Sequence, residues 1–408
     1  MISLTETVSN YKCLKLRLFE SWRSPKKRHT KKQQTMINRL KVKGLNGKLD
    51  FDITFNEDIN LLTGKNGTGK TTILKLIWYL NGGYIANLLT EVNFQEIELD
   101  VNSIKILVKR TELKNERGIN WEFKIEPDRQ TFKDVHILPE NYSFQIKERQ
   151  LRNIEYTHPS MFGQANILRD VSMPTLFFPT FRRIEGGFSM EDNNKFGNDP
   201  FARNPIKQSL QELSQRFSFH KHKFISSIST DDLVQLITSE YATKTAKFNQ
   251  QQKELSDKVI NSIKERKNKN DSELLASIQS DIEQLENERT EHFKPFTVLS
   301  DLITQIFQHK GIKLNNLTIG DISNSISSEK LSAGEKQMLS FICYNTFIIN
   351  SAIFIDEPEL SLHPDWQRIL LPTLLRQNDS NQYFMATHSP FIYTKYQDKE
   401  IIISEDKG

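Results

Sequence analysis

The sequence predicts an α/β fold in which a mixed sheet is flanked by helices and carries both an antiparallel β subdomain and a helical insertion. A glycine-rich turn joins an apolar strand to a helix at residues 59–77. Apolar runs that end in polar residues recur at 351–357 and 382–388, as in buried parallel strands. Polar and apolar residues alternate with period two at 94–126 and follow helical spacing at 206–296.

The turn Gly64–Thr71 has the spacing of a phosphate-binding loop between a strand and a helix. Its glycines let backbone N–H groups surround a polyphosphate, and the helix start adds partial positive charge. Lys70 is expected to reach the β- and γ-phosphates, and the Thr71 hydroxyl to ligate Mg²⁺. We therefore assign triphosphate binding to seven residues: Gly64, Asn66, Gly67, Gly69, Lys70, Thr71 and Thr72.

Two carboxylates end the apolar run at 351–357. Asp356, at the carboxyl end of a buried strand, is suited to be a second Mg²⁺ ligand. Glu357 is the candidate general base that activates the water attacking the γ-phosphate. His388 ends the run at 382–388 and is a candidate for γ-phosphate contact, although a histidine at a strand end can also be structural.

The segment Leu331–Gln337 opens an apolar helical pattern. Ser332, with Glu335 three residues later, predicts a capping box. A helix N-terminus that carries a serine hydroxyl and Gly334 is also suited to an anion, so both interpretations can hold.

These motifs together resemble the head of the ABC-type ATPases in order and in spacing. Five motifs carry the resemblance: the phosphate loop, Leu331–Gln337, Ile353–Glu357, Ser361–Pro364 and Thr387–His388. The first, second, third and fifth correspond to the Walker A motif, the signature motif, the Walker B motif and the histidine switch. The pair Glu335–Lys336 resembles the SMC/RecF branch. Residues 356–367 resemble the OLD-like ATPases, which include ATPase subunits of bacterial anti-phage systems such as Septu and PARIS.

The resemblance implies an ABC-type P-loop ATPase head that hydrolyses ATP with Mg²⁺, with Glu357, His388 and Lys70 as catalytic residues. The preference for adenine rests on the resemblance alone. In that family the signature motif of one subunit completes the nucleotide site of another. Ser332, Gly334 and Glu335 would then contact nucleotide in trans, so that ATP joins two heads into a homodimer or a higher assembly.

The glutamine switch of transporter heads has no equivalent that can be placed in this sequence. The apolar stretch 174–185 runs into two arginines and resembles a segment of the OLD-like defence ATPases. Arg182 or Arg183 could approach the nucleotide because a guanidinium matches phosphate geometry, and Arg183 is the candidate that we assign. A surface arginine pair is the alternative.

The chain is expected to divide into a basic tail or mis-assigned start at 1–35, ATPase lobes at 36–205 and 297–408, and a helical insertion at 206–296. The first part holds nine Lys/Arg against two Glu, so its net charge is +7 and that of the remainder is −3. Overall charge therefore gives no argument for nucleic-acid binding. The tail itself could be a nucleic-acid-binding arm, a solvated extension or an upstream-start artefact, with Met36 as the true start.

Residues 241–295 predict a short antiparallel helical hairpin. Apolar residues repeat at three- and four-residue spacing in two arms, separated by a polar stretch at 264–271. The arms would either pack on the head or project and dock a partner through Arg266, Lys267 and Lys269.

Composition excludes several classes of protein. The sequence has 408 residues and 37% hydrophobic residues, and no apolar run reaches the length of a membrane span. Cys13 and Cys343 cannot form a disulfide framework, and no secretory signal is visible. These features favour a reducing, cytoplasmic location.

Two functions follow from the motifs. Twenty residues follow His388, which leaves no room for the TOPRIM nuclease that some OLD-type proteins carry there. ATP hydrolysis is thus the expected chemistry. In the first function the chain is the ATPase scaffold and sensor of an anti-phage system and controls a separate effector, expected to be a nuclease. In the alternative it is a RecF/SMC-like repair or recombination ATPase that binds DNA directly. A transporter head is disfavoured because the Glu335–Lys336 variant of the signature motif does not fit it.

Overall fold

The computed structural model describes residues 36–102, 104–112, 119–127, 142–147, 168, 172–180, 182–184, 212–215, 217–218, 221–264, 271–307 and 331–404. All of these residues belong to one unit of the chain, residues 35–408. The predicted basic segment 1–35 and the proposed docking residues at the hairpin tip lie outside the described residues.

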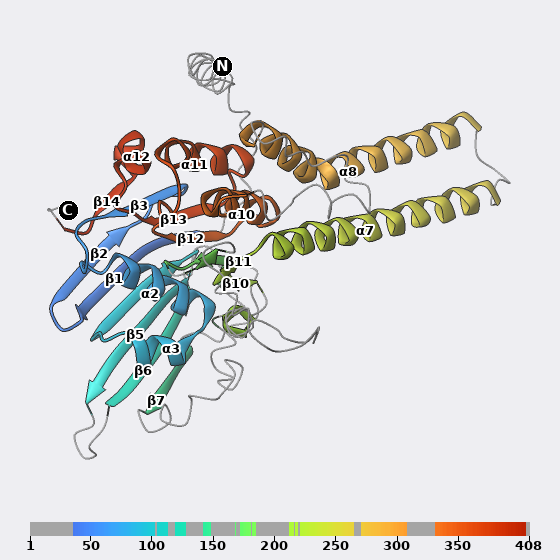
Figure 1. Ribbon diagram of the computed structural model, residues 1–408. Coiled ribbons are helices and arrows are strands. Elements are labelled where there is room, and N and C mark those ends of the chain that lie inside the picture. The colour runs from blue at the N-terminus through green and yellow to red at the C-terminus, as the bar shows by residue number, and fades with distance from the viewer. Residues whose placement is uncertain are drawn as a thin grey trace, which may run out of the picture. The chain divides into compact units, whose positions relative to one another are not determined.

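A six-stranded parallel sheet forms the centre of this unit (Figure 1). Its strands are, in spatial order, β10 (His222–Phe224), β8 (Thr175–Phe178), β12 (Ala352–Asp356), β13 (Gln382–Ala386), β3 (Ile59–Thr63) and β14 (Glu400–Ile402). Every pair in it is parallel, where the sequence prediction expected a mixed sheet. Parallel neighbours need long crossover connections, and here segments from both ends of the chain supply adjacent strands.

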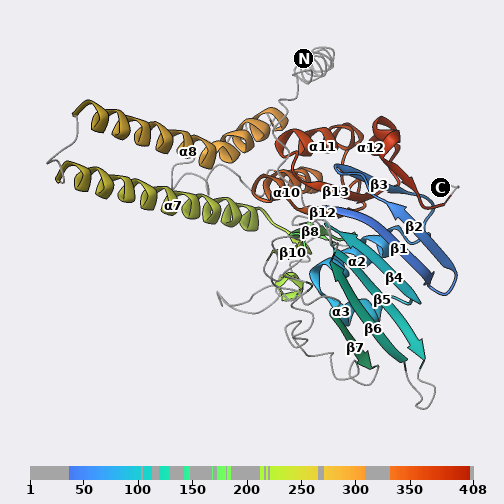
Figure 2. The ribbon, with the colours of Figure 1, turned by 180° about the vertical axis from the view of Figure 1, so that it is seen from behind.

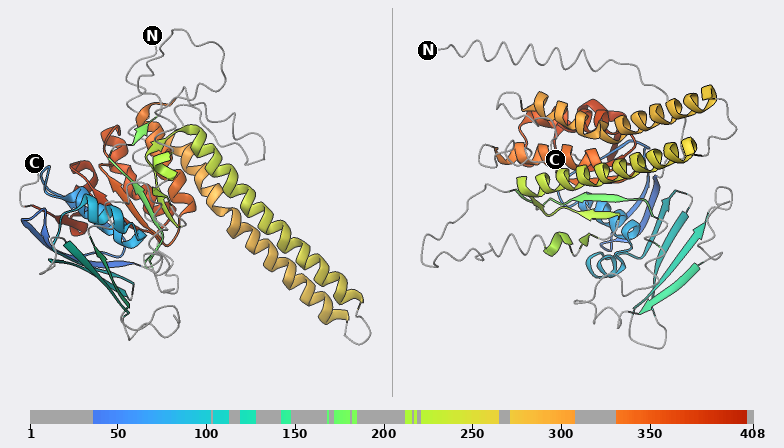
Figure 3. Two further views of the ribbon diagram at one scale, coloured as in Figure 1. Left: turned by 90° about the horizontal axis from the view of Figure 1, so that it is seen from below. Right: turned by 90° about the vertical axis from the view of Figure 1, so that its right-hand side faces the viewer.

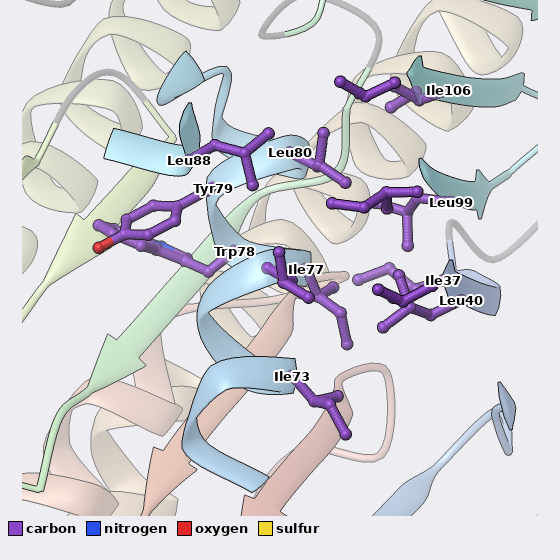
Figure 4. Packing of buried hydrophobic residues seen from close by; sticks show 14 of the residues in the cluster. Ile37, Leu40, Ile73, Ile77, Trp78, Tyr79, Leu80, Leu88, Leu99 and Ile106 are labelled. Carbon is purple, nitrogen blue, oxygen red and sulfur yellow. The ribbon is translucent and has the colours of Figure 1, made fainter. Parts of the chain in front are cut away.

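An antiparallel six-stranded sheet packs beside the first. Its strands are, in spatial order, β2 (Leu49–Thr54), β1 (Ile37–Leu45), β4 (Glu96–Val101), β5 (Ile104–Glu112), β6 (Ile119–Pro127) and β7 (Tyr142–Lys147). Its inner face meets helices α2 (Lys70–Gly82) and α3 (Ile85–Glu91). Figure 4 shows Ile73 and Ile77 of α2 facing Leu40 of β1 and Leu99 of β4. The predicted α/β fold with an antiparallel subdomain is thereby confirmed.

Each central strand is buried on both faces, which explains why these strands read as continuous apolar runs. Phe354 of β12 belongs to the core shared with α2 and the antiparallel sheet. Its neighbours Ile353 and Ile355 point the other way, into a second core. Helices α10 (Ala333–Phe347), α11 (Pro364–Gln377) and α12 (Pro390–Tyr393) contribute to that second core and lie together in Figure 2.

The two longest helices form a hairpin. They are α7 (Thr230–Lys264) and α8 (Asp271–Ile306), which run side by side in opposite directions (Figure 3). Leu233 and Leu299 at the base are buried in the second core. Further out, Ile260 and Leu275 are exposed. The hairpin therefore has a buried base and a solvated outer part.

The helical pattern differs from its predicted limits at both ends. Residues 222–228, expected to be helical, form the short strands β10 and β11 (Ser227–Ile228). Strand β11 pairs with β9 (Arg183–Ile184). At the other end, α8 continues past residue 296 because Leu299 and Ile303 extend its buried stripe into the head core. Tertiary contacts with the head thus set both limits.

Candidate nucleotide-binding site

The predicted site residues come together at the carboxyl edge of the parallel sheet. The phosphate loop follows β3, Asp356 ends β12, and His388 follows β13, which lies between those two strands. Because parallel strands share one carboxyl edge, three segments far apart in sequence deliver their polar residues to the same place.

The loop from Gly64 to Lys70 has the backbone of a polyphosphate cradle. Gly64, Gly67 and Gly69 have φ angles of 141°, 79° and 98°, which side-chain-bearing residues rarely adopt. A Cβ added to Gly67 would meet no atom within 4 Å, so the loop is open there. Helix α2 starts at Lys70 with no side-chain cap and no acidic residue in its first turn. Its partial positive charge therefore remains for an anion, and the residues present fit a triphosphate.

Lys70 lies inside this loop. Its Nζ donates to the carbonyl oxygens of Gly64 and Lys65, both at 2.8 Å. Burial lowers the pKa of Lys70, while the carboxylates of Glu357 and Asp356 oppose that effect. The ammonium is thus held where a phosphate oxygen could replace a carbonyl as its partner.

Asp356 accepts hydrogen bonds on both carboxylate oxygens. Thr71 Oγ1 donates to Oδ1 at 3.0 Å, and Thr180 Oγ1 donates to Oδ2. Burial raises the pKa of Asp356, and the two hydroxyl bonds oppose the rise. A hydroxyl beside a carboxylate provides the hard oxygen ligands that Mg²⁺ prefers, so this pair fits the expected metal.

Thr180 was missed by the sequence reasoning. It lies two residues after the buried strand β8, at the same sheet edge as Asp356. The signal was available, because Thr180 is a polar residue after an apolar run, as His388 is.

Glu357 occupies a strained turn directly after β12. Its φ angle is 49°, a left-handed conformation that costs a non-glycine residue on the order of 1–3 kcal/mol. Its N–H donates to the carbonyl of Ala386 at 2.8 Å. Burial raises the pKa of Glu357, and repulsion from Asp356 and Glu359 adds to the rise. A raised pKa strengthens a carboxylate as a base, as the predicted role requires.

Arg182 donates hydrogen bonds to the backbone of that turn. Its Nη1 donates to the carbonyls of Pro179 (2.7 Å) and Asp356 (2.9 Å), and its Nη2 donates to the carbonyl of Glu357 (3.0 Å). The guanidinium also lies over the Phe341 ring, 5.5 Å from its centre. Burial lowers the pKa of Arg182 to about 10, so the group stays charged at neutral pH. Arg182 is therefore a buried residue that holds three backbone carbonyls in place, and it does not lie on the surface.

Arg183, the arginine assigned to nucleotide contact, has its backbone in β9. Its side chain lies outside the described part of the structure, so the assignment stays a prediction.

His388 is held by a residue that the sequence reasoning did not assign. Its backbone N–H donates to Glu359 Oε1 at 2.6 Å, and the Thr387 hydroxyl donates to Glu359 Oε2 at 2.9 Å. The His388 side chain is half-buried and close enough to Glu357 to oppose the rise in the pKa of that carboxyl. The predicted base and the predicted γ-phosphate contact thus lie near each other.

The signature motif, Leu331–Gln337, forms the predicted capping box. Glu335 N–H donates to Ser332 Oγ at 3.4 Å, and Ser332 N–H donates to Glu335 Oε2 at 2.7 Å. The helix start packs tightly on the loop after β12, since a Cβ added to Gly334 would lie 2.3 Å from the Ser361 carbonyl oxygen. Contact of Ser332, Gly334 and Glu335 with nucleotide on a second copy stays a prediction.

Across the described residues, none of the helices combines the length and the apolar character that a membrane crossing requires.

Comparison with known proteins yields one family and several relatives. The model of the AAA ATPase domain matches residues 36–393. The "Retron Vc95 probable ATPase" of Vibrio cholerae serotype O1 biovar El Tor is 24% identical over 396 residues, which are 88% of this chain and 71% of that protein. The "Septu protein PtuA" of Bacillus thuringiensis is 44% identical over 45 residues, 11% of each chain. These matches confirm the resemblance inferred from the motifs.

Solved structures give weaker overlaps. The Smc head domain of Pyrococcus furiosus bound to the C-terminal domain of ScpA has a TM-score of 0.36 at 14% identity and covers 88% of this chain and 91% of that one. The recombination mediator RecF has a TM-score of 0.32 at 12% identity and covers 88% of this chain and 94% of that one. Overlaps of this quality give no indication of function.

Proposed function

This chain belongs to the AAA ATPase domain family, and we propose that it is the ATP-hydrolysing subunit of an anti-phage defence system. In this role it is a cytoplasmic scaffold and sensor that binds a separate effector, a nuclease, and controls it through ATP-dependent assembly of heads. The observation that carries the proposal is the similarity to a retron ATPase along 88% of the chain, together with the match to a Septu protein.

The site supplies the groups that hydrolysis needs. The loop residues Gly64 to Thr72 would hold the triphosphate, and Thr71 with Asp356 would hold Mg²⁺, which when bound neutralises phosphate charge. Glu357 accepts a proton from the attacking water, and the strained turn fixes the direction of its carboxylate. His388 and Lys70 stabilise negative charge on the γ-phosphate.

The proposed assembly of heads depends on the signature motif, Leu331–Gln337. Ser332, Gly334 and Glu335 of one copy complete the site of another, so that ATP joins two copies and hydrolysis releases them. Ser332→Arg is then expected to abolish hydrolysis while each copy still binds nucleotide. Fluorescence titration with an ATP analogue and a phosphate-release assay separate these two effects.

A mixing experiment tests the shared site directly. Ser332→Arg protein and Lys70→Ala protein are each expected to be inactive, for different reasons. A mixed dimer contains one site with both an intact Lys70 and an intact Ser332, so mixing restores part of the activity. Equal loss of binding and hydrolysis in Ser332→Arg, with no recovery on mixing, argues against assembly in trans.

The partner is identified by capture from the native host with neighbouring genes intact. Tagged Glu357→Gln protein should bind ATP without hydrolysing it and so accumulate in the assembled state. Tagged Lys70→Ala protein is the matched control that cannot assemble through ATP. A nuclease that co-elutes stoichiometrically with the former supports the defence role. Bound DNA without a protein partner instead supports the alternative, a RecF/SMC-like repair ATPase.

A further inference from the structure

Glu359 uses both of its carboxylate oxygens to join two loops of the site. One loop, residues 357–363, follows β12 and presents Glu357. The other, residues 387–389, follows β13 and presents His388. Glu359 Oε1 accepts the His388 N–H at 2.6 Å, and Oε2 accepts the Thr387 hydroxyl at 2.9 Å. Charge-assisted hydrogen bonds of this kind are about twice as strong as neutral ones.

The loop after β13 is buried at Thr387 and has a second link to the loop after β12. The Thr387 side chain is fully buried. Its hydroxyl oxygen also accepts the Ser389 N–H at 3.0 Å, so the turn is already folded around it. Gln367 makes a second bridge, since its amide donates to the Leu362 carbonyl at 2.7 Å and accepts the Ser389 hydroxyl at 2.5 Å. The two loops are thus joined at two points.

We propose that Glu359 is a positioning residue that couples His388 to the loop of the general base. Through it, the group that activates water and the group that faces the γ-phosphate move as one body. Glu359 itself touches no reacting atom and acts through His388. The inference rests on the proposed ATPase function for its consequence, while the coupling of the loops is a property of the chain alone.

Substitutions at Glu359 separate geometry from charge. Glu359→Gln can keep both contacts, because its amide oxygen accepts the His388 N–H and its amide nitrogen donates to the Thr387 oxygen. Glu359→Ala removes both. We expect Glu359→Ala to lower kcat by roughly 10- to 100-fold, as for other residues that orient a functional group, with little change in ATP affinity. Glu359→Gln should restore most of the lost kcat.

A double-mutant cycle shows whether Glu359 acts through His388. In a His388→Ala background, Glu359→Ala should lower kcat no further than Glu359→Gln, which removes the same negative charge beside Glu357. If the fold-losses of kcat in the two single variants multiply in the double variant, the proposal is wrong. Equal loss of kcat in Glu359→Gln and Glu359→Ala also overturns it. Glu91→Ala is the matched control, because Glu91 also accepts a side-chain hydroxyl, that of Tyr79 at 2.6 Å, on helix α3 outside the site.

Two further measurements keep the test decisive. Should Glu359→Ala fail to fold, Thr387→Val removes the Oε2 contact together with the Ser389 N–H contact and leaves the Oε1 contact in place. Its smaller loss of kcat should also vanish in the His388→Ala background. Amide hydrogen exchange provides a readout without ATP: Glu359→Ala should raise exchange at 386–389, and Glu91→Ala should not. Unchanged exchange there refutes the coupling. A wild-type chain that does not hydrolyse ATP, with exchange raised as expected, refutes the proposed function and leaves the coupling in place.

Discussion

The head and the outer hairpin are built on opposite principles. In the head, buried hydrogen bonds join distant parts of the chain, such as the bond from Ile37 N to Gln382 Oε1 at 2.8 Å. In the hairpin, contacts join one helix to its neighbour, such as the exposed ion pair between Lys258 and Asp281 at 2.6 Å. The difference teaches that the proposed nucleotide site depends on long-range packing in the head, whereas the hairpin is expected to tolerate substitution along most of its length.

The largest contrast is expected between two lysines. Lys70→Ala should lower ATP hydrolysis by at least about 100-fold, because a preorganised cation on the transferred phosphate is removed. Lys294→Ala on the hairpin removes a side chain that is 62% exposed and paired with Glu291, and it should leave hydrolysis unchanged. A phosphate-release assay on both purified variants measures the contrast. Comparable activity in the two would contradict the placement of the site.

A contrast of intermediate size is expected between two arginines that lie over phenylalanine rings. Arg182→Met removes a charged donor shared by three carbonyls, of which that of Glu357 keeps the Leu360 N–H, and should cost about 3 kcal/mol of unfolding free energy. Arg289→Met removes a side chain that is 57% exposed and lies over Phe248, and it should cost less than about 1 kcal/mol.

Urea unfolding followed by tryptophan fluorescence compares the two arginine variants. Arg182→Met should also lower kcat, since the strained Glu357 turn loses its support. If Arg289→Met were the more destabilising change, the head and hairpin would not differ as described.

The smallest effect is expected within the hairpin itself. Lys258→Ala breaks the ion pair with Asp281, but the Lys258 side chain is 64% exposed. The free energy of unfolding should fall by only about 0.2–1 kcal/mol, and the difference from wild type should shrink in high salt. A loss of several kcal/mol, insensitive to salt, would mean that this pair anchors the hairpin.

Local spacing determined a large part of this molecule. The turn from Gly64 to Lys70 needs glycines at fixed positions, so its sequence alone indicates the cradle. The capping box of Ser332 and Glu335 is equally local, because both partners lie within one helical turn. The hairpin follows from repeated apolar spacing, which is a short-range signal as well.

Residues that act through distant partners could not be found in this way. The sequence left Arg182 open as a nucleotide contact or as one of a surface arginine pair, yet it is buried against the backbone because β8 and β12 are neighbours in the sheet. In the sequence, Glu359 is one more acidic residue in a polar loop. Its two partners come from 28 and 29 residues further on, and only the pairing of β12 with β13 brings them within reach.

The sequence by itself was enough to predict which groups bind a triphosphate, because phosphate-binding chemistry depends on residue types at short, fixed spacing. Tertiary structure alone decided how those groups are supported. Strand order sets which loops become neighbours, and strand order depends on how two cores are buried at once on both faces of the central sheet. No local pattern encodes that arrangement, since burial is a property of the whole folded chain.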